Sequence, residues 1–170
     1  ADVLRHSKGS ERQDLIFHLA SPAGPAMMCP EREVLWQIVR DARAVFNAAA
    51  RWGSRVIAFS SSEVYGRERV TCDEGVTLEV RMPWTARYEY AVGKMAMECM
   101  GFSHLHPLIQ FIRPTQVCGA GQNPAGGAVL PRFIQQAVQG EPLTIFGSGR
   151  QQRQFTHLDD CLEFCWLLME

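Results

Sequence analysis

Long apolar runs, a strong net charge and paired cysteine motifs are all missing from this sequence, and each absence argues against a class of protein. No apolar run reaches the roughly 18 residues that a membrane-spanning helix needs, so we expect no membrane segment. The 170 residues have a formal net charge of −1 and no long basic stretch, which argues against nucleic acid as a partner. The six cysteines never form a CxxC pair, so we expect reduced thiols and a cytoplasmic protein.

The overall composition is that of an ordinary globular domain. Hydrophobic residues make up 46% of the chain and charged residues 21%, and the length is sufficient for one domain with a core. The sequence starts on a charged stretch and stops inside the apolar run CLEFCWLLME. We therefore expect it to be a piece of a longer chain.

Predicted strands and helices alternate along the sequence. Short apolar runs predict strands at 14–20, 55–60 and 108–112, and helical periodicity predicts helices at 31–52, 86–103, 129–138 and 157–170. We expect a long loop over 67–85, a glycine-rich loop over 118–127, and a short strand between two turns within 140–149. The alternation predicts an α/β domain with a parallel sheet.

Polar or special residues follow each of the three main predicted strands. They are Ser21-Pro22, the run Ser60-Ser61-Ser62-Glu63, and Arg113-Pro114. In open α/β sheets, ligands bind beyond the carboxyl ends of parallel strands, so we expect these residues to lie side by side along one edge. The serine run taken alone is equally compatible with a simple turn.

The segment YEYAVGK adds a second chemical signal. It places Tyr90 and Lys94 four residues apart, on the same face of a predicted helix. A free tyrosine has a pKa near 10, and a nearby ammonium group favours the phenolate, which can act as a base. The pair alone could face solvent by chance, but a serine-ended strand upstream makes the combination more specific.

In these segments the sequence resembles the extended short-chain dehydrogenase/reductases that modify nucleotide sugars with NAD. DLIFHLAS is similar to the strand under the cofactor, FSSSEVYG to the catalytic-serine strand, YAVGK to the Tyr/Lys helix, and IRPTQVCGAGQ to the segment between nicotinamide and sugar. The stretch LPRFIQQAVQGEPLTIFGSGRQQRQFTHLDD resembles the nucleotide-binding region. The resemblance implies a Rossmann-like doubly wound parallel sheet. It implies a partial NAD-binding domain over 1–122 and the start of a nucleotide-sugar-binding region over 123–170.

The resemblance also implies residue roles. Tyr90 would take the proton of the sugar 4-hydroxyl, Lys94 would lower the Tyr90 pKa and hold the nicotinamide ribose, and Ser61 would hydrogen-bond the 4-oxygen. Glu63, with Ser62, would act on the resulting ketose. The implied NAD-binding residues are Leu19, Ala20, Ser21, Ser60, Tyr90, Lys94 and Pro114, and the implied substrate-binding residues are Gln116, Arg132, Phe146 and Arg153.

The reaction is less clearly indicated than the family. Glu63 in the S-x-E-V-Y-G pattern favours a UDP-glucuronate decarboxylase or a 4,6-dehydratase, whereas the YAVGK motif is nearer to GDP-mannose dehydratases and to general epimerases. A 4-epimerase, a non-catalytic binding homologue and a reductase of a small ketone remain alternatives. The family's G-x-x-G-x-x-G turn for the pyrophosphate does not occur in residues 1–170, so this stretch alone would hold NAD poorly.

Three further expectations concern partners and histidines. The resemblance implies a homodimer formed through helices 31–52 and 86–103. His104 and His106 lack other ligands at a recognisable spacing, so we expect no metal site. His18 lies in a predicted buried strand, where we expect a core histidine.

Overall fold

The computed structural model describes residues 12–22, 33–66, 74–75 and 86–170, and it divides into two compact units. One unit ends at Arg113 and the other begins at Pro114. Nearly all of the loop predicted over 67–85 lies outside the described residues, as do Cys29 and Cys72.

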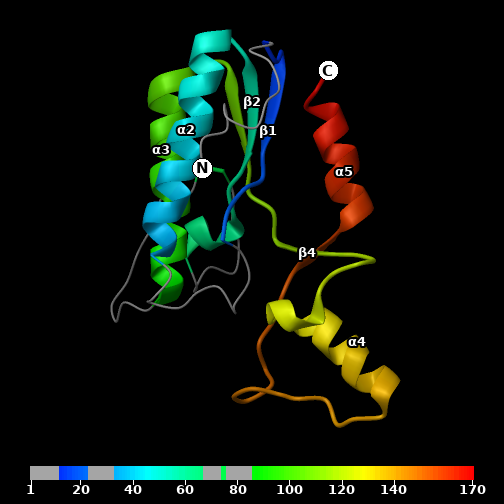
Figure 1. The fold of residues 1–170 in the computed structure, drawn as a ribbon. Coiled ribbons are helices and arrows are strands. Elements are labelled where there is room, and N and C mark those ends of the chain that lie inside the picture. Colours follow the sequence, from blue (N-terminus) through cyan, green and yellow to red (C-terminus); the bar gives the residue numbers. More distant parts are fainter. Residues whose placement is uncertain (1–11, 23–32, 67–73, 76–85) are drawn as a thin grey trace. The chain divides into compact units, whose positions relative to one another are not determined.

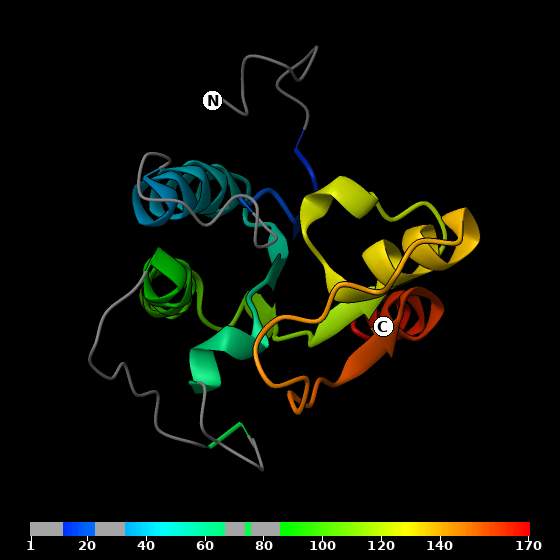
Figure 2. The ribbon, with the colours of Figure 1, turned by 90° about the horizontal axis from the view of Figure 1, so that it is seen from below.

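The first unit is a parallel sheet with two helices on one face (Figures 1 and 2). Its strands are β1 (Leu15–His18), β2 (Arg55–Phe59) and β3 (Ile109–Ile112), in the order β1-β2-β3, and α2 (Val34–Trp52) and α3 (Ala86–Leu105) connect them. Ile16 pairs with Val56, which in turn pairs with Ile109, so the centre of the sheet is apolar. The predicted α/β fold with parallel strands is confirmed.

Helix α2 packs on the sheet through one apolar stripe. Val34, Ile38, Ala42, Val45, Phe46 and Ala49 recur at helical spacing, and all six are buried in the core. Gly53 ends the helix as predicted, since it adopts the left-handed conformation (φ 66°) that a side chain would disfavour.

Helix α3 lies unusually close to its neighbours because two of its positions are glycine. A Cβ atom at Gly101 would lie 2.5 Å from the Phe111 ring and 2.7 Å from the Ile109 side chain. A Cβ atom at Gly93 would lie 3.2 Å from the Cα of Leu35 on α2. Close contact with both β3 and α2 leaves α3 little room to shift, which gives its side chains a defined position.

The second unit contains a two-stranded parallel sheet and two α-helices. The strands are β4 (Gln116–Cys118) and β5 (Phe155–His157), and the helices are η4 (Pro124–Gly126, a 3₁₀ turn), α4 (Val129–Gln139) and α5 (Leu158–Leu167). The His157 side chain accepts a hydrogen bond from the Asp159 backbone at the start of α5, in agreement with the predicted helix start.

Two sequence predictions in this unit are wrong. Neither β4 nor β5 was expected, because runs of three residues carry almost no periodic signal. The short strand expected within 140–149 is instead an irregular segment. There the Gln136 side chain bonds both the backbone N–H of Thr144, at 3.1 Å, and its hydroxyl, at 2.7 Å, so a side chain takes the place of a neighbouring strand.

Among the described residues, none of the helices combines the length and the apolar character that crossing a membrane requires.

Burial of His18 makes the stability of the fold depend on pH. The side chain is 4% exposed and packs edge-on against Phe46. Burial and the nearby positive charge of Lys94 lower its pKa to about 4. Since the unfolded chain takes up a proton near pH 6.5 and the folded chain does not, stability is complete above pH 6.5 and falls as the pH drops towards 4.

We predict that the free energy of unfolding falls by about 2–3 kcal/mol between pH 7.5 and 4.5 through this group. His18→Leu, which cannot titrate, should lose correspondingly less over the same range. Urea denaturation of both proteins at the two pH values measures the difference. Parallel pH dependences would show that His18 is protonated in the folded protein.

Candidate active site

The carboxyl ends of the three strands of the first unit form one edge of the sheet, which we call the strand-end rim. His18 pairs with Ala58 and Phe59 with Ile112 near the ends of the strands. The residues that follow are therefore neighbours, as predicted: Leu19 to Ser21 after β1, Ser60 to Glu63 after β2, and Arg113 after β3.

The serine run forms a capped turn at this rim. Ser61 is extended and precedes the 3₁₀ helix η3 (Ser62–Tyr65), and its hydroxyl oxygen accepts the Glu63 N–H at 3.2 Å. Because the oxygen acts as the acceptor, the hydroxyl proton can still be donated to another group. The adjacent Ser60 hydroxyl is buried and has no hydrogen-bond partner among the described residues. Both the turn interpretation and the site interpretation of the serines therefore apply.

Tyr90 and Lys94 project from α3 towards this turn. Both are buried, at 8% and 3% exposed, and the Lys94 ammonium lies 5.7 Å from the centre of the Tyr90 ring. Lys94 Nζ donates a 2.6 Å hydrogen bond to the carbonyl of Phe59, the last residue of β2. The Ser61 hydroxyl is also near enough to Tyr90 to act on its pKa as a hydrogen-bond donor. The structure thus brings together the three residues that the sequence analysis singled out.

Relative to free side chains, the pKa of Tyr90 is raised and the pKa of Lys94 is lowered. Burial raises the pKa of Tyr90, the hydrogen bond from Ser61 opposes that rise, and the negative charge of Glu63 adds to it. Burial lowers the pKa of Lys94 to about 8, against the opposing effect of the Glu98 carboxylate. Burial of the phenolate therefore leaves the Tyr90 pKa above its ordinary value. The lowering effect of Lys94 that the resemblance implies stays a prediction.

Glu63 and Ser62 lie in the first turn of η3, each partly exposed. The Glu63 charge acts on Tyr90, which places its carboxylate within electrostatic reach of the phenol. This position is compatible with an acid–base or orienting role beside the rim.

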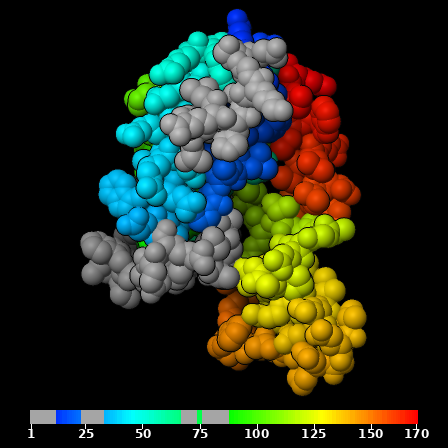
Figure 3. Space-filling view, viewed as in Figure 1, coloured from blue at the N-terminus to red at the C-terminus, as the bar shows by residue number. Residues whose placement is uncertain are grey.

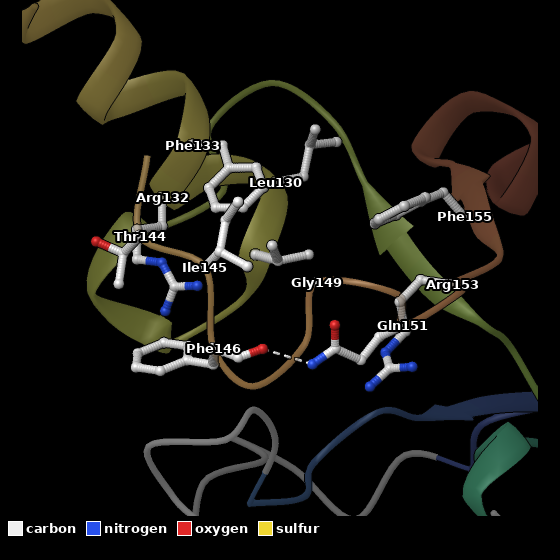
Figure 4. Close-up of a pocket in the computed structure, with 11 residues that line it drawn as sticks. Leu130, Arg132, Phe133, Thr144, Ile145, Phe146, Gly149, Gln151, Arg153 and Phe155 are labelled. Carbon is white, nitrogen blue, oxygen red and sulfur yellow. Dashed lines mark hydrogen bonds between the residues drawn. The ribbon is translucent and has the colours of Figure 1, made fainter. Parts of the chain in front are cut away.

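The second unit carries a pocket of about 560 Å³ between α4, the segment 144–153 and β5 (Figure 4). Three of the four predicted substrate-binding residues, Arg132, Phe146 and Arg153, line it. The Arg132 guanidinium lies 4.8 Å from the centre of the Phe146 ring, and its Nε is buried without a hydrogen-bond partner among the described residues. The amide of Gln151 donates to the Phe146 carbonyl at 2.6 Å and closes the loop.

The fourth predicted residue, Gln116, is exposed on β4, where it pairs with Phe155, and it does not line this pocket. Pro114, expected near NAD, is the first residue of the second unit. Throughout the described segments, no three His, Cys, Asp or Glu residues are grouped as metal ligands.

Sequence reasoning missed an ion pair at the rim. Arg113 and Glu98 are paired at 2.6 Å, and Glu98 is buried. Glu98 follows Lys94 by four residues, and this spacing was the available signal.

A parallel α/β sheet with a serine, a tyrosine and a lysine gathered at its strand-end rim defines a dehydrogenase-like class of site. The model of the NAD dependent epimerase/dehydratase family matches residues 2–170. The chain belongs to this family.

The proteins that are similar to this chain include enzymes of three different reactions. It is 31% identical over 157 residues to a UDP-N-acetyl-alpha-D-glucosaminuronate decarboxylase of Bacillus cytotoxicus, an alignment that covers 89% of this chain and 49% of the relative. The structure of a UDP-glucuronic acid 4-epimerase from Bacillus cereus, in complex with UDP-glucuronic acid and NAD, superposes with a TM-score of 0.79 at 26% identity, covering 92% of this chain and 49% of that one. An NAD-dependent NDP-hexosamine 5,6-dehydratase, TunA, superposes with a TM-score of 0.77 at 26% identity, covering 91% and 51%. The chain thus spans about half the length of these proteins.

We predict that Lys94 makes its own contribution to the pH dependence of stability. Its pKa is about 8 in the folded protein and near 10.5 in the unfolded chain. The folded state therefore gains stability as the pH rises through this window, and the same stability is lost as the pH falls from 10.5 to 8. Relative to Lys94→Met, the wild-type protein should gain about 3 kcal/mol in unfolding free energy between pH 8 and 10.5.

Denaturant titrations of both proteins at pH 8, 9 and 10 would measure this gain. A difference that does not vary with pH would mean that Lys94 keeps an ordinary pKa despite its burial.

Proposed function

We propose that this chain is part of an enzyme that uses NAD to oxidise C4 of a nucleotide sugar to a 4-ketose and then modifies that ketose. The observation that carries the proposal is the meeting of Ser61, Tyr90 and Lys94 at the strand-end rim. Packing alone does not require these three polar groups, since burying them costs free energy.

The residues at the rim fit the nicotinamide end of NAD. The buried Ser60 hydroxyl has no partner among the described residues and can bond a ligand. Lys94 uses one of its three N–H donors on Phe59, so two remain in principle for ribose hydroxyls. Leu19, Ala20 and Ser21 follow β1 at the same rim and would lie along the cofactor. When bound, NAD supplies an acceptor for the hydride of the sugar C4.

The side chains of this chain would handle the proton. The Tyr90 oxygen would take the proton of the C4 hydroxyl as the C4 hydride leaves, and the Ser61 hydroxyl would turn its single proton from Tyr90 to the C4 oxygen once the sugar is bound. The Ser61 hydrogen bond favours the phenolate form of Tyr90, and it partly offsets the cost of burial.

The pocket of the second unit supports a nucleotide diphosphate as the part of the substrate that is bound but not changed in the reaction. Arg132 and Arg153 supply two guanidinium groups, which suit phosphate oxygens, and Phe146 supplies an aromatic face for a base. A reductase of a small ketone would have no use for such a pocket.

Among the possible reactions, we favour decarboxylation of UDP-glucuronate or 4,6-dehydration of an NDP-sugar. Glu63 supports this choice, because its carboxylate acts on Tyr90 and a 4-ketose there would have an acid–base group beside it. The similarity to a decarboxylase at 31% identity adds support. A 4-epimerase is the alternative, supported by the structural similarity to the Bacillus cereus enzyme.

We expect the full-length protein to turn over a nucleotide sugar in the presence of NAD, and Tyr90→Phe to lower kcat by about 10²–10⁴-fold, since proton transfer contributes that much. Incubation with UDP-glucuronate, UDP-glucose and GDP-mannose, followed by mass spectrometry, separates the reactions. A product that is lighter by about 44 Da indicates decarboxylation, and one lighter by about 18 Da indicates dehydration. A product of unchanged mass that contains a different sugar indicates epimerisation.

Isothermal titration with UDP serves as the control, because Tyr90→Phe should leave UDP binding unchanged. Binding of UDP and NAD without turnover of any of these sugars would favour the non-catalytic homologue. Turnover of small ketones without UDP binding would favour the reductase.

We also propose that the protein forms a homodimer through α2 and α3. Atoms of α2 are visible on the face drawn in the space-filling view (Figure 3), and Trp36 of this helix is 61% exposed. Phe102 on α3 is 51% exposed. Light scattering should report a dimer, and Trp36→Glu should shift it towards the monomer because a charge would have to be buried at the interface. A monomeric wild-type protein at micromolar concentration would contradict the proposal.

A further inference from the structure

One face of α3 carries a third polar residue below the catalytic pair. Tyr90, Lys94 and Glu98 follow one another at intervals of four residues, so they form a row along the helix. Glu98 is only 4% exposed. A carboxylate this deeply buried is costly unless other groups compensate its charge.

Arg113 at the end of β3 provides that compensation. Its Nε donates to Glu98 Oε1 at 2.9 Å and its Nη2 donates to Glu98 Oε2 at 2.6 Å. This two-pronged geometry is specific to arginine, because the planar guanidinium matches both oxygens of a carboxylate. The pair joins α3 to the strand-end rim.

Arg113 also reaches the serine turn. Its guanidinium lies 5.0 Å from the centre of the Tyr65 ring, and the Tyr65 side chain acts on the Arg113 pKa as a hydrogen-bond partner. Tyr65 is the buried last residue of η3, the turn that Ser61 caps. Ser61 is therefore held on both sides, since Phe59 before it accepts the bond from Lys94 and Tyr65 after it is held by Arg113.

We infer that Glu98, Arg113 and Tyr65 form a positioning clamp that holds the serine turn at hydrogen-bonding distance from Tyr90. That this clamp serves catalysis rests on the proposed function. The contacts of the clamp themselves join three elements of the first unit and do not depend on which substrate is bound. None of its members is assigned to proton or hydride transfer. They act through Ser61, whose bond to Tyr90 requires η3 and α3 to keep a fixed separation.

A purely stabilising role explains the clamp less well. Buried ion pairs are often no more stabilising than apolar groups of the same volume. The two parallel bonds between Arg113 and Glu98, by contrast, fix the relative orientation of the two side chains. The clamp also belongs to the electrostatic surroundings of the site. Glu98 favours the charged form of Lys94, His18 faces Lys94 from β1, and Glu63 faces Tyr90 from η3.

The test uses two conservative variants of the full-length protein. Arg113→Lys keeps the positive charge but cannot bond both carboxylate oxygens and Tyr65 together, and Tyr65→Phe keeps the ring and the ion pair but removes the hydroxyl. NMR titration of ¹³Cζ-labelled tyrosine, with the Tyr90 signal assigned through Tyr90→Phe, measures the Tyr90 pKa without any substrate.

We expect both variants to raise the Tyr90 pKa by about one unit, because the hydrogen bond from Ser61 weakens. On the substrate found in the activity screen, kcat should fall by about 10–100-fold with KM within about threefold, which is the signature of misplaced catalytic groups. Arg51→Lys is the matched control, since Arg51 is exposed at the end of α2, and it should change neither quantity.

The clamp is refuted as a positioning device if both variants lower the thermal midpoint while the Tyr90 pKa stays within 0.2 units, roughly the precision of such titrations. If Arg113→Lys fails to fold, Tyr65→Phe decides alone, since it leaves the Glu98–Arg113 pair intact. The titration needs no turnover, so a wrong proposal for the reaction would leave this result standing.

Discussion

The bond from the Lys94 ammonium to the Phe59 carbonyl is the contact on which the geometry of the candidate site depends. It ties the middle of α3 to the last residue of β2, directly before the serine turn. Without this bond, the buried Lys94 ammonium and the Phe59 carbonyl would each lack a hydrogen-bond partner, which costs free energy. The site is thus anchored to two rigid elements, although the serines themselves lie in a turn.

Close packing makes this anchoring possible. Gly93 and Gly101 let α3 approach α2 and β3 closely, since a Cβ atom at either position would crowd its neighbours, so the helix has little freedom to slide. The polar row on α3 can then be buried among precise partners: Ser61 for Tyr90, Phe59 for Lys94, and Arg113 for Glu98. Burial lowers the pKa of Lys94 to about 8, because the effect of desolvation is larger than the opposing effect of the Glu98 carboxylate.

The two units differ in how they would serve a nucleotide sugar. The first unit offers groups for proton transfer, and these are buried and mutually bonded. The second offers a pocket with Arg132, Arg153 and Phe146, in which the Arg132 Nε lacks a partner among the described residues and Phe146 is 64% exposed. Each set of groups suits one part of the proposed substrate, since the proton-transfer groups suit a reactive sugar and the guanidinium and aromatic groups suit a charged nucleotide.

Local patterns in the sequence determined the order of the main elements, the end of α2 at Gly53, and the pairing of Tyr90 with Lys94 one helical turn apart, because each depends on periodicity or on the backbone freedom of a single residue. Tertiary structure alone decided three other features. The strands β4 and β5 form only because they pair with each other, the segment around Thr144 stays irregular because the side chain of Gln136 on α4 bonds it, and the Tyr90 pKa rises because of burial. The Glu98–Arg113–Tyr65 clamp belongs to this second group, since its members come from a helix, a strand end and a turn that only folding brings together.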